Sequence, residues 1–134
     1  MTDLVFFYGT LMSGFKRPGR TRVDLALEAV GRGWIQAVLF DLGIYPAAIP
    51  ATDSRVRGEV HRMLDVDAVL LALDEIEGYR SSQPDASLYV RRETAVMLDG
   101  GKVADAWVYF YNAPLGGAQR IDSGDYLEYL KVKP

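Results

Sequence analysis

One helical segment with strand patterns on both sides limits what this chain can fold into. From Asp65 the sequence reads DVDAVLLALDEIEGY, and its apolar residues recur every three or four positions. That spacing predicts an amphipathic helix over residues 66–77, with Gly78 as the residue that ends it. The predicted apolar stripe consists of Val66, Val69, Leu70, Leu73 and Ile76.

Apolar runs separated by turn residues predict strands in most of the remaining sequence. Residues 4–8, LVFFY, are expected to form a buried strand that ends at Gly9. Alternation from Asp24 places Leu25, Leu27 and Ala29 on one face of a second strand pattern. Glycines then bend or bulge the chain before strands expected at residues 34–42 and 57–63.

The end of the chain reads as a hairpin followed by a short helix. Residues 88–98 and 102–111 alternate as strands and are joined at Asp99-Gly100-Gly101. The order of elements predicts an α+β fold with a mixed, largely antiparallel sheet that curls into a small β-barrel. At 134 residues and 49% hydrophobic content, the chain is expected to form a single domain over residues 1–134.

Composition removes several classes of function. A net charge of −3 argues against a nucleic-acid or anionic-membrane partner. The chain has no cysteine and one histidine, so thiolate catalysis, a Cys-based or multi-histidine metal site and a Ser-His-Asp triad are not expected. No apolar run approaches the ~20 residues of a membrane helix, and the N-terminus lacks a basic region before its apolar run. The expected location is the cytoplasm.

Glu77 is the candidate catalytic residue. At about 100° per residue it falls on the apolar stripe of the predicted helix, whereas Glu75 points the opposite way. Burial and the negative end of the helix dipole both disfavour its charged form, so its pKa is expected to be raised. A carboxyl group of this kind is a candidate general acid or base. The helix pattern alone leaves two structural alternatives, a side chain turned to water or one paired with an arginine.

A second candidate element is the turn after the first strand. A strand that breaks at Gly9 exposes backbone N–H groups that can bind a carboxylate, and Tyr8 and Thr10 add hydroxyl groups. Read locally, this segment is also an ordinary strand end.

Charged residues elsewhere have simple alternative explanations. Arg91 shares a strand face with Tyr89 and can hold a carboxylate, although a solvated strand edge is the alternative. Asp74 is expected to be a charge on the helix surface. The basic loop 14–20 is expected to be solvated, although its cations can also contact an anion.

Six motifs in a fixed order resemble the gamma-glutamylcyclotransferase-like superfamily, over about residues 4–126. They are YGTLM at 8–12, GIYPA at 43–47, RGEV at 57–60, LDEIEGY at 73–79, YVRR at 89–92 and AWVYFY at 106–111. The resemblance implies a compact mixed fold with a small β-barrel. It also implies that the turn formed by Tyr8, Gly9, Thr10 and Leu11 holds the substrate α-carboxylate through backbone amides.

The resemblance further implies that Glu77 is the single catalytic carboxylate and that Tyr89 and Arg91 lie beside the substrate. Residues 79–88 form a longer connection than in many relatives, which affects the placement of this pair. The implied reaction releases 5-oxoproline from a small γ-glutamyl molecule and uses no cofactor.

Three other functions are left open. One is a related γ-glutamyl transfer or amide cleavage, and another is a non-catalytic module that binds a small carboxylate. The third is a purely structural or partner-binding role. The oligomeric state and the leaving group are left open.

Overall fold

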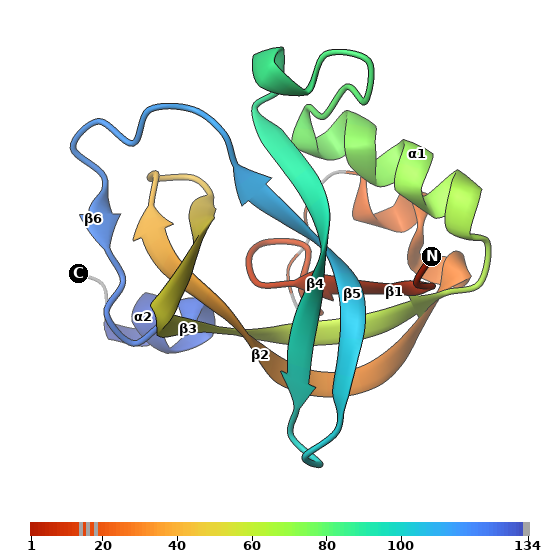
Figure 1. The fold of residues 1–134 in the computed structure, drawn as a ribbon, viewed down its shortest axis with the longest axis horizontal. Coiled ribbons are helices and arrows are strands. Elements are labelled where there is room, and N and C mark those ends of the chain that lie inside the picture. Colours follow the sequence, from red (N-terminus) through yellow and green to blue (C-terminus); the bar gives the residue numbers. More distant parts are fainter. Residues whose placement is uncertain (14, 16, 18, 133–134) are drawn as a thin grey trace.

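A closed β-barrel forms the centre of the computed structural model, which describes residues 1–13, 15, 17 and 19–132 (Figure 1). Within these residues five strands pair in the order β3-β1-β5-β4-β2, and pairing of β2 with β3 closes the barrel. β1 and β5 run parallel, whereas the other adjacent strands run antiparallel. The strands are β1 (Leu4–Phe7), β2 (Leu27–Asp41), β3 (Pro46–Met63), β4 (Tyr89–Leu98), β5 (Val103–Tyr111) and the short β6 (Gln119–Arg120), which pairs antiparallel with the end of β2.

Two α-helices flank the barrel. α1 (Val66–Glu77) lies on one side, and α2 (Tyr126–Val132) lies with β6 on the other (Figure 1). Single 3₁₀ turns occur at Arg20–Arg22, Asp24–Ala26 and Pro84–Ala86. The predicted α+β class, with its mixed sheet and small barrel, is confirmed. None of the helices in the described residues has the length and apolar character needed to cross a membrane.

The prediction for helix α1 is confirmed in its bounds and its buried face. The Asp65 carboxylate caps the first turn by accepting the Ala68 N–H at 3.2 Å. At the other end Gly78 adopts φ 71°, and the N–H groups of Gly78 and Tyr79 both donate to the Asp74 carbonyl. This is a Schellman-type ending, which fixes where Glu77 leaves the helix.

The predicted strands before the helix were wrong in extent. Residues 24–26 form a 3₁₀ turn, and Leu25 is 97% exposed while Val23 is buried. β2 and β3 are long continuous strands, because register shifts between Ala29 and Gly31 and between Gln36 and Ala37 absorb the breaks in alternation.

The buried face of α1 allows a direct test of its packing. Leu73 is fully buried, whereas Leu71 on the same helix is 65% exposed. Leu73→Ala should lower the free energy of unfolding by about 2–5 kcal/mol, because it removes buried methyl groups and leaves a cavity. Leu71→Ala should change it by less than about 0.5 kcal/mol. Urea denaturation measures both, and equal effects would contradict the packing described here.

Candidate active site

A small cavity lies beyond the end of β1, where the turn after this strand meets the end of α1. Its volume is about 30 Å³. The walls of this cavity come from several elements: Phe6 and Phe7 of β1, the turn after β1, Pro46 at the start of β3, and side chains of β4 and β5. The lining residues are Phe6, Phe7, Tyr8, Gly9, Thr10, Leu11, Arg17, Tyr45, Pro46, Glu77, Tyr89 and Tyr109.

Glu77 brings the one carboxylate among these lining residues. Its side chain is 10% exposed, as its place on the apolar stripe predicts. Burial raises its pKa from 4.5 to about 7, and the nearby Arg17 cation opposes this shift. The predicted direction of the pKa shift is therefore confirmed. Glu77 is divided between its acid and base forms near neutral pH, which suits a group that both accepts and returns a proton.

The turn after β1 borders the cavity and is closed by a backbone hydrogen bond. Met12 N–H donates to the Gly9 carbonyl at 3.0 Å, which closes the turn. Within the described residues, the N–H groups of Gly9, Thr10 and Leu11 have no hydrogen-bond acceptor. A methyl group at Gly9 would lie 2.7 Å from Pro46 Cγ, so the close approach of these two segments requires glycine.

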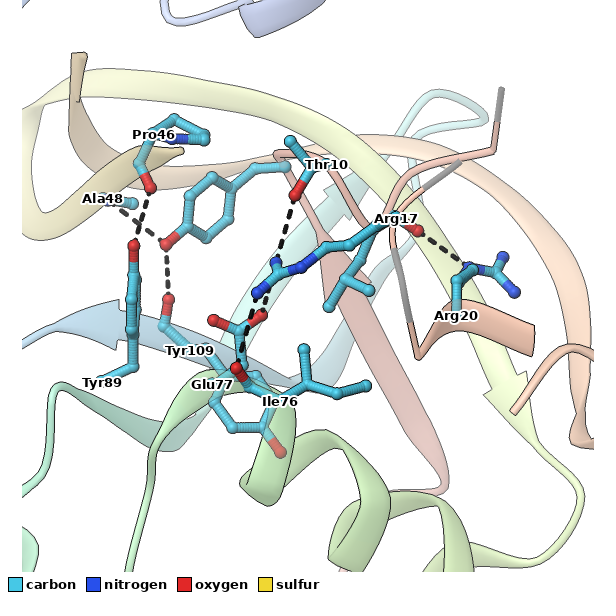
Figure 2. A network of polar contacts seen from close by, with 11 residues as sticks. Thr10, Arg17, Arg20, Pro46, Ala48, Ile76, Glu77, Tyr89 and Tyr109 are labelled. Atoms are coloured by element: carbon cyan, nitrogen blue, oxygen red, sulfur yellow. Dashed lines mark hydrogen bonds and ion pairs between the residues drawn. The ribbon is translucent and has the colours of Figure 1, made fainter. Parts of the chain in front are cut away.

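Arg17 is the site residue that the sequence did not single out. Its Nη1 lies 3.1 Å from Thr10 Oγ1 and 3.4 Å from Glu77 Oε1, and its Nη2 lies 3.4 Å from the Ile76 carbonyl (Figure 2). Its guanidinium also lies 4.4 Å from the centre of the Tyr45 ring. The available signal was the basic character of loop 14–20. Gly14, Lys16 and Pro18 of that loop lie outside the described residues.

Two tyrosine hydroxyl groups bond to the backbone around the cavity. Tyr8 donates to the Tyr109 carbonyl at 2.6 Å and accepts the Ala48 N–H at 3.3 Å. Tyr89 donates to the Pro46 carbonyl at 3.0 Å (Figure 2). Burial raises the pKa of both phenols, so they stay neutral. Tyr8 and Tyr89 line the cavity as expected, and their hydroxyl groups tie β5 and β3 to its walls.

Arg91 lies apart from the cavity lining. Its Nε donates to Asp74 Oδ1 at 2.8 Å, and its guanidinium lies 4.5 Å from the centre of the Trp107 ring. The Tyr109 hydroxyl donates to the same Asp74 oxygen at 2.6 Å. The interpretation of Asp74 as a helix-surface charge was wrong, because an isolated helix pattern does not show that β4 and β5 supply two partners. Arg91 and Asp74 instead join α1 to the hairpin behind Tyr109.

The connection over residues 79–88 is held by its own hydrogen bonds. The buried Ser87 hydroxyl accepts the Arg80 N–H at 2.8 Å and donates to the Gln83 carbonyl at 3.0 Å. The Asn112 side-chain amide donates to the Pro84 and Ser87 carbonyls. These contacts set the start of β4 and thereby place Tyr89 against the cavity.

Comparison with known proteins agrees with this architecture. Residues 5–128 match the family described as Gamma-glutamyl cyclotransferase, AIG2-like. A Methanocaldococcus jannaschii protein, MJ1514, with a provisional gamma-glutamylcyclotransferase name is 29% identical over 128 residues, covering 95% of this chain and 98% of that protein. The Escherichia coli K12 gamma-glutamylcyclotransferase family protein YtfP is 34% identical over 90 residues, covering 67% of each chain.

Solved structures show the same fold. The solution structure of ytfP from Escherichia coli superimposes with a TM-score of 0.66 at 28% identity, covering 93% of this chain and 96% of that one. An aig2-like protein from Mus musculus superimposes with a TM-score of 0.64 at 23% identity, covering 84% and 80%. The family match spans nearly the whole chain, and both solved structures share its fold. The chain therefore belongs to the gamma-glutamyl cyclotransferase, AIG2-like family.

Proposed function

We propose that this protein is a gamma-glutamylcyclotransferase that converts a γ-glutamyl compound into 5-oxoproline and a free amine or amino acid. The observation that carries the proposal is Glu77, a buried carboxyl group with a pKa of about 7 at a cavity bordered by the turn from Gly9 to Leu11, whose amides have no acceptor among the described residues. The family match supports the reaction class, and the leaving group is the open part of the proposal.

The proposed reaction begins with the substrate α-carboxylate on the amides of Gly9 to Leu11 and its α-ammonium beside Glu77. The Glu77 carboxylate removes one proton, and the free amine attacks the γ-carbonyl carbon of the same molecule. Glu77 then returns this proton to the departing nitrogen as the amide C–N bond breaks, and it passes the second proton of the ring nitrogen to the released amine. The products are the lactam N–H of 5-oxoproline and the amine as its ammonium form, and Glu77 is again a carboxylate. Nucleophile and electrophile share one molecule, so the protein supplies orientation and proton transfer, and the proposed reaction needs no cofactor.

A substrate panel tests this proposal. Purified protein is incubated with γ-glutamyl amino acids, γ-glutamyl amines and glutathione, and 5-oxoproline is detected by mass spectrometry. We expect release from at least one class. If no compound yields 5-oxoproline while one binds tightly in calorimetry, the protein is a carboxylate-binding module. Hydrolysis to glutamate, or transfer to another acceptor, would instead identify a related γ-glutamyl reaction.

The pH dependence of the reaction follows from the pKa of Glu77. Only the carboxylate form removes a proton, and burial raises this pKa to about 7. The kcat/KM value should therefore fall about tenfold per unit as the pH drops below about 7. Initial rates at low substrate concentration between pH 5 and 9 measure this acid limb. A midpoint near the ordinary glutamate pKa of 4.5 would contradict the raised pKa of Glu77 in the free enzyme.

A further inference from the structure

The Arg17 guanidinium is enclosed at the cavity but weakly bound there. Its side chain is 14% exposed, and its contacts with Thr10, Glu77 and the Ile76 carbonyl are 3.1–3.4 Å long. A strong arginine–carboxylate pair is instead bidentate, with two parallel bonds of about 2.7–2.9 Å. Arg17 makes a single long contact with its carboxylate.

Among the described residues, the Arg17 guanidinium makes three hydrogen bonds with its N–H donors. A guanidinium remains charged at any physiological pH and presents five N–H donors, so an enclosed one is stabilised by an anion. Glu77 is an imperfect counter-charge, because burial keeps it partly protonated near neutral pH. A carboxylate that approached Arg17 would find a planar donor group able to bind both of its oxygens.

The cavity is small, about 30 Å³, and it is partly open to solvent. A water molecule needs roughly 10–15 Å³, so a side chain that moved aside would enlarge the space for a glutamyl group. Tyr8 and Tyr89 are fixed by hydrogen bonds to the backbone. Arg17 has a long flexible side chain and hydrogen bonds of 3.1–3.4 Å, so of these three residues it is the one best able to withdraw from Glu77 (Figure 2).

We propose that Arg17 is a substrate-binding residue that receives the α-carboxylate of the γ-glutamyl group while Glu77 binds the α-ammonium. The inference rests on the proposed function and deepens it. The α-carboxylate and the α-ammonium of the substrate are attached to the same carbon atom. Arg17 and Glu77 carry the complementary charges, and their Nη1 and Oε1 atoms lie 3.4 Å apart. The substrate head therefore replaces one long ion pair with two, and Thr10, the Arg17 neighbour, keeps the carboxylate beside the amides of the turn.

The same arrangement favours release of the product. Cyclisation converts the α-ammonium into an uncharged lactam N–H, whereas the carboxylate is unchanged. The product can still contact Arg17 but has no cation for Glu77. Re-formation of the Arg17–Glu77 contact then competes with the bound 5-oxoproline.

The test compares Arg17→Gln with wild type on three probes. L-γ-glutamyl-L-alanine carries both carboxylates, 4-aminobutanoyl-L-alanine lacks the α-carboxylate, and L-γ-glutamyl-n-butylamine lacks the one on the leaving group. Lactam release, measured by mass spectrometry, gives kcat/KM for each. Wild type should prefer L-γ-glutamyl-L-alanine over 4-aminobutanoyl-L-alanine, and Arg17→Gln should reduce this preference roughly 10- to 100-fold, mainly through KM. Arg17→Lys, which keeps the charge without the planar fork, should lie between them.

Arg22→Gln is the matched control. Arg22, in the 3₁₀ turn at Arg20–Arg22, pairs with the exposed Glu75 of α1 at 3.0 Å and is not part of the cavity lining. Arg22→Gln should leave the preference for L-γ-glutamyl-L-alanine over 4-aminobutanoyl-L-alanine unchanged. Melting curves show whether each variant is folded. An unchanged preference in Arg17→Gln would overturn the proposal. So would a loss confined to probes with a leaving-group carboxylate, or a gain in activity on all three probes.

Binding measurements separate this inference from the proposed reaction. If wild type turns over none of the probes, calorimetry with L-γ-glutamyl-L-alanine and 4-aminobutanoyl-L-alanine still reports recognition of the α-carboxylate. Preferential binding by wild type that is lost in Arg17→Gln would support the role of Arg17 even if the reaction were different. Equal binding of the two compounds, or binding of neither, would overturn it.

Discussion

Glu77→Gln should lower kcat for 5-oxoproline release by about 10²–10⁴-fold, the usual contribution of general acid–base catalysis. Glutamine has nearly the same size and keeps a hydrogen-bonding group beside Arg17, but it can neither take the proton from the α-ammonium nor return it to the leaving nitrogen. Steady-state rates for any substrate identified by the panel measure the loss. Full activity in the variant on every accepted substrate would remove Glu77 from the mechanism.

Glu75→Gln is the matched control for this substitution. It lies two residues away on α1, is exposed, and pairs with Arg22 rather than with a cavity residue. It should retain wild-type kcat. A comparable loss in both variants would indicate a general effect on the helix rather than the removal of a proton carrier.

Stability provides a second check on Glu77→Gln. The pKa of Glu77 is about 7 in the folded chain, whereas the unfolded chain has the ordinary glutamate value of 4.5. Between these two pH values the carboxyl group is protonated in the folded chain and ionised in the unfolded chain. This difference lowers the stability of wild type as pH rises from about 4.5 to 7, by on the order of 3 kcal/mol. The glutamine variant lacks this loss. The free energy of unfolding of Glu77→Gln, compared with that of wild type, should therefore increase over that pH range. This result would show that the variant loses activity while it remains folded.

Gly9→Ala should reduce kcat/KM by roughly 100-fold while the chain remains folded. The added Cβ would lie 2.7 Å from Pro46 Cγ and 3.0 Å from Pro46 Cδ. The proline ring is rigid, and the Pro46 carbonyl accepts the Tyr89 hydroxyl, so the turn rather than Pro46 is expected to shift. A displacement of about 1 Å in substrate-positioning groups can cost about 10²-fold in rate. The overpacking should also destabilise the fold by about 1–3 kcal/mol.

Gly100→Ala is the control for Gly9→Ala, because it makes the same substitution at a position where the added methyl group meets no other atom. A Cβ at Gly100, in the hairpin turn between β4 and β5, would meet no atom within 4 Å. This variant should have wild-type kcat/KM and nearly wild-type stability. If Gly9→Ala were equally active, the close contact between the turn and Pro46 would have no part in positioning the substrate.

Local sequence patterns predicted the elements whose structure is determined locally. The helix at residues 66–77 has a complete apolar stripe, a capping aspartate and a terminal glycine, so its bounds and the burial of Glu77 followed from the pattern. The hairpin of β4 and β5 was predicted within about a residue at each end, because alternation and the glycine-rich turn at residues 99–101 agree. The lengths of β2 and β3 could not be predicted, since their register shifts depend on pairing between the strands.

The candidate site was only partly predictable for the same reason. The burial of Glu77 and the turn at residues 9–11 follow from their own segments. Arg17 contacts Glu77 across 60 positions of sequence, and nothing in the basic loop distinguishes it from a solvated cation. Asp74 obtains partners from β4 and β5, which a helix pattern cannot show.

The parallel pairing of β1 with β5 has a consequence for the order in which the chain folds. β1 lies at the start of the sequence, yet Val5 pairs with Trp107, and the Tyr8 hydroxyl bonds to a carbonyl 101 positions later. Contacts of such long range form slowly, because a large loop must close before any pairing stabilises it. The helix that carries Glu77 and the β4–β5 hairpin can form locally much earlier. We therefore expect the Glu77 carboxylate to be in place on its helix before β1 docks, and the cavity between them to be among the last parts of the structure to form.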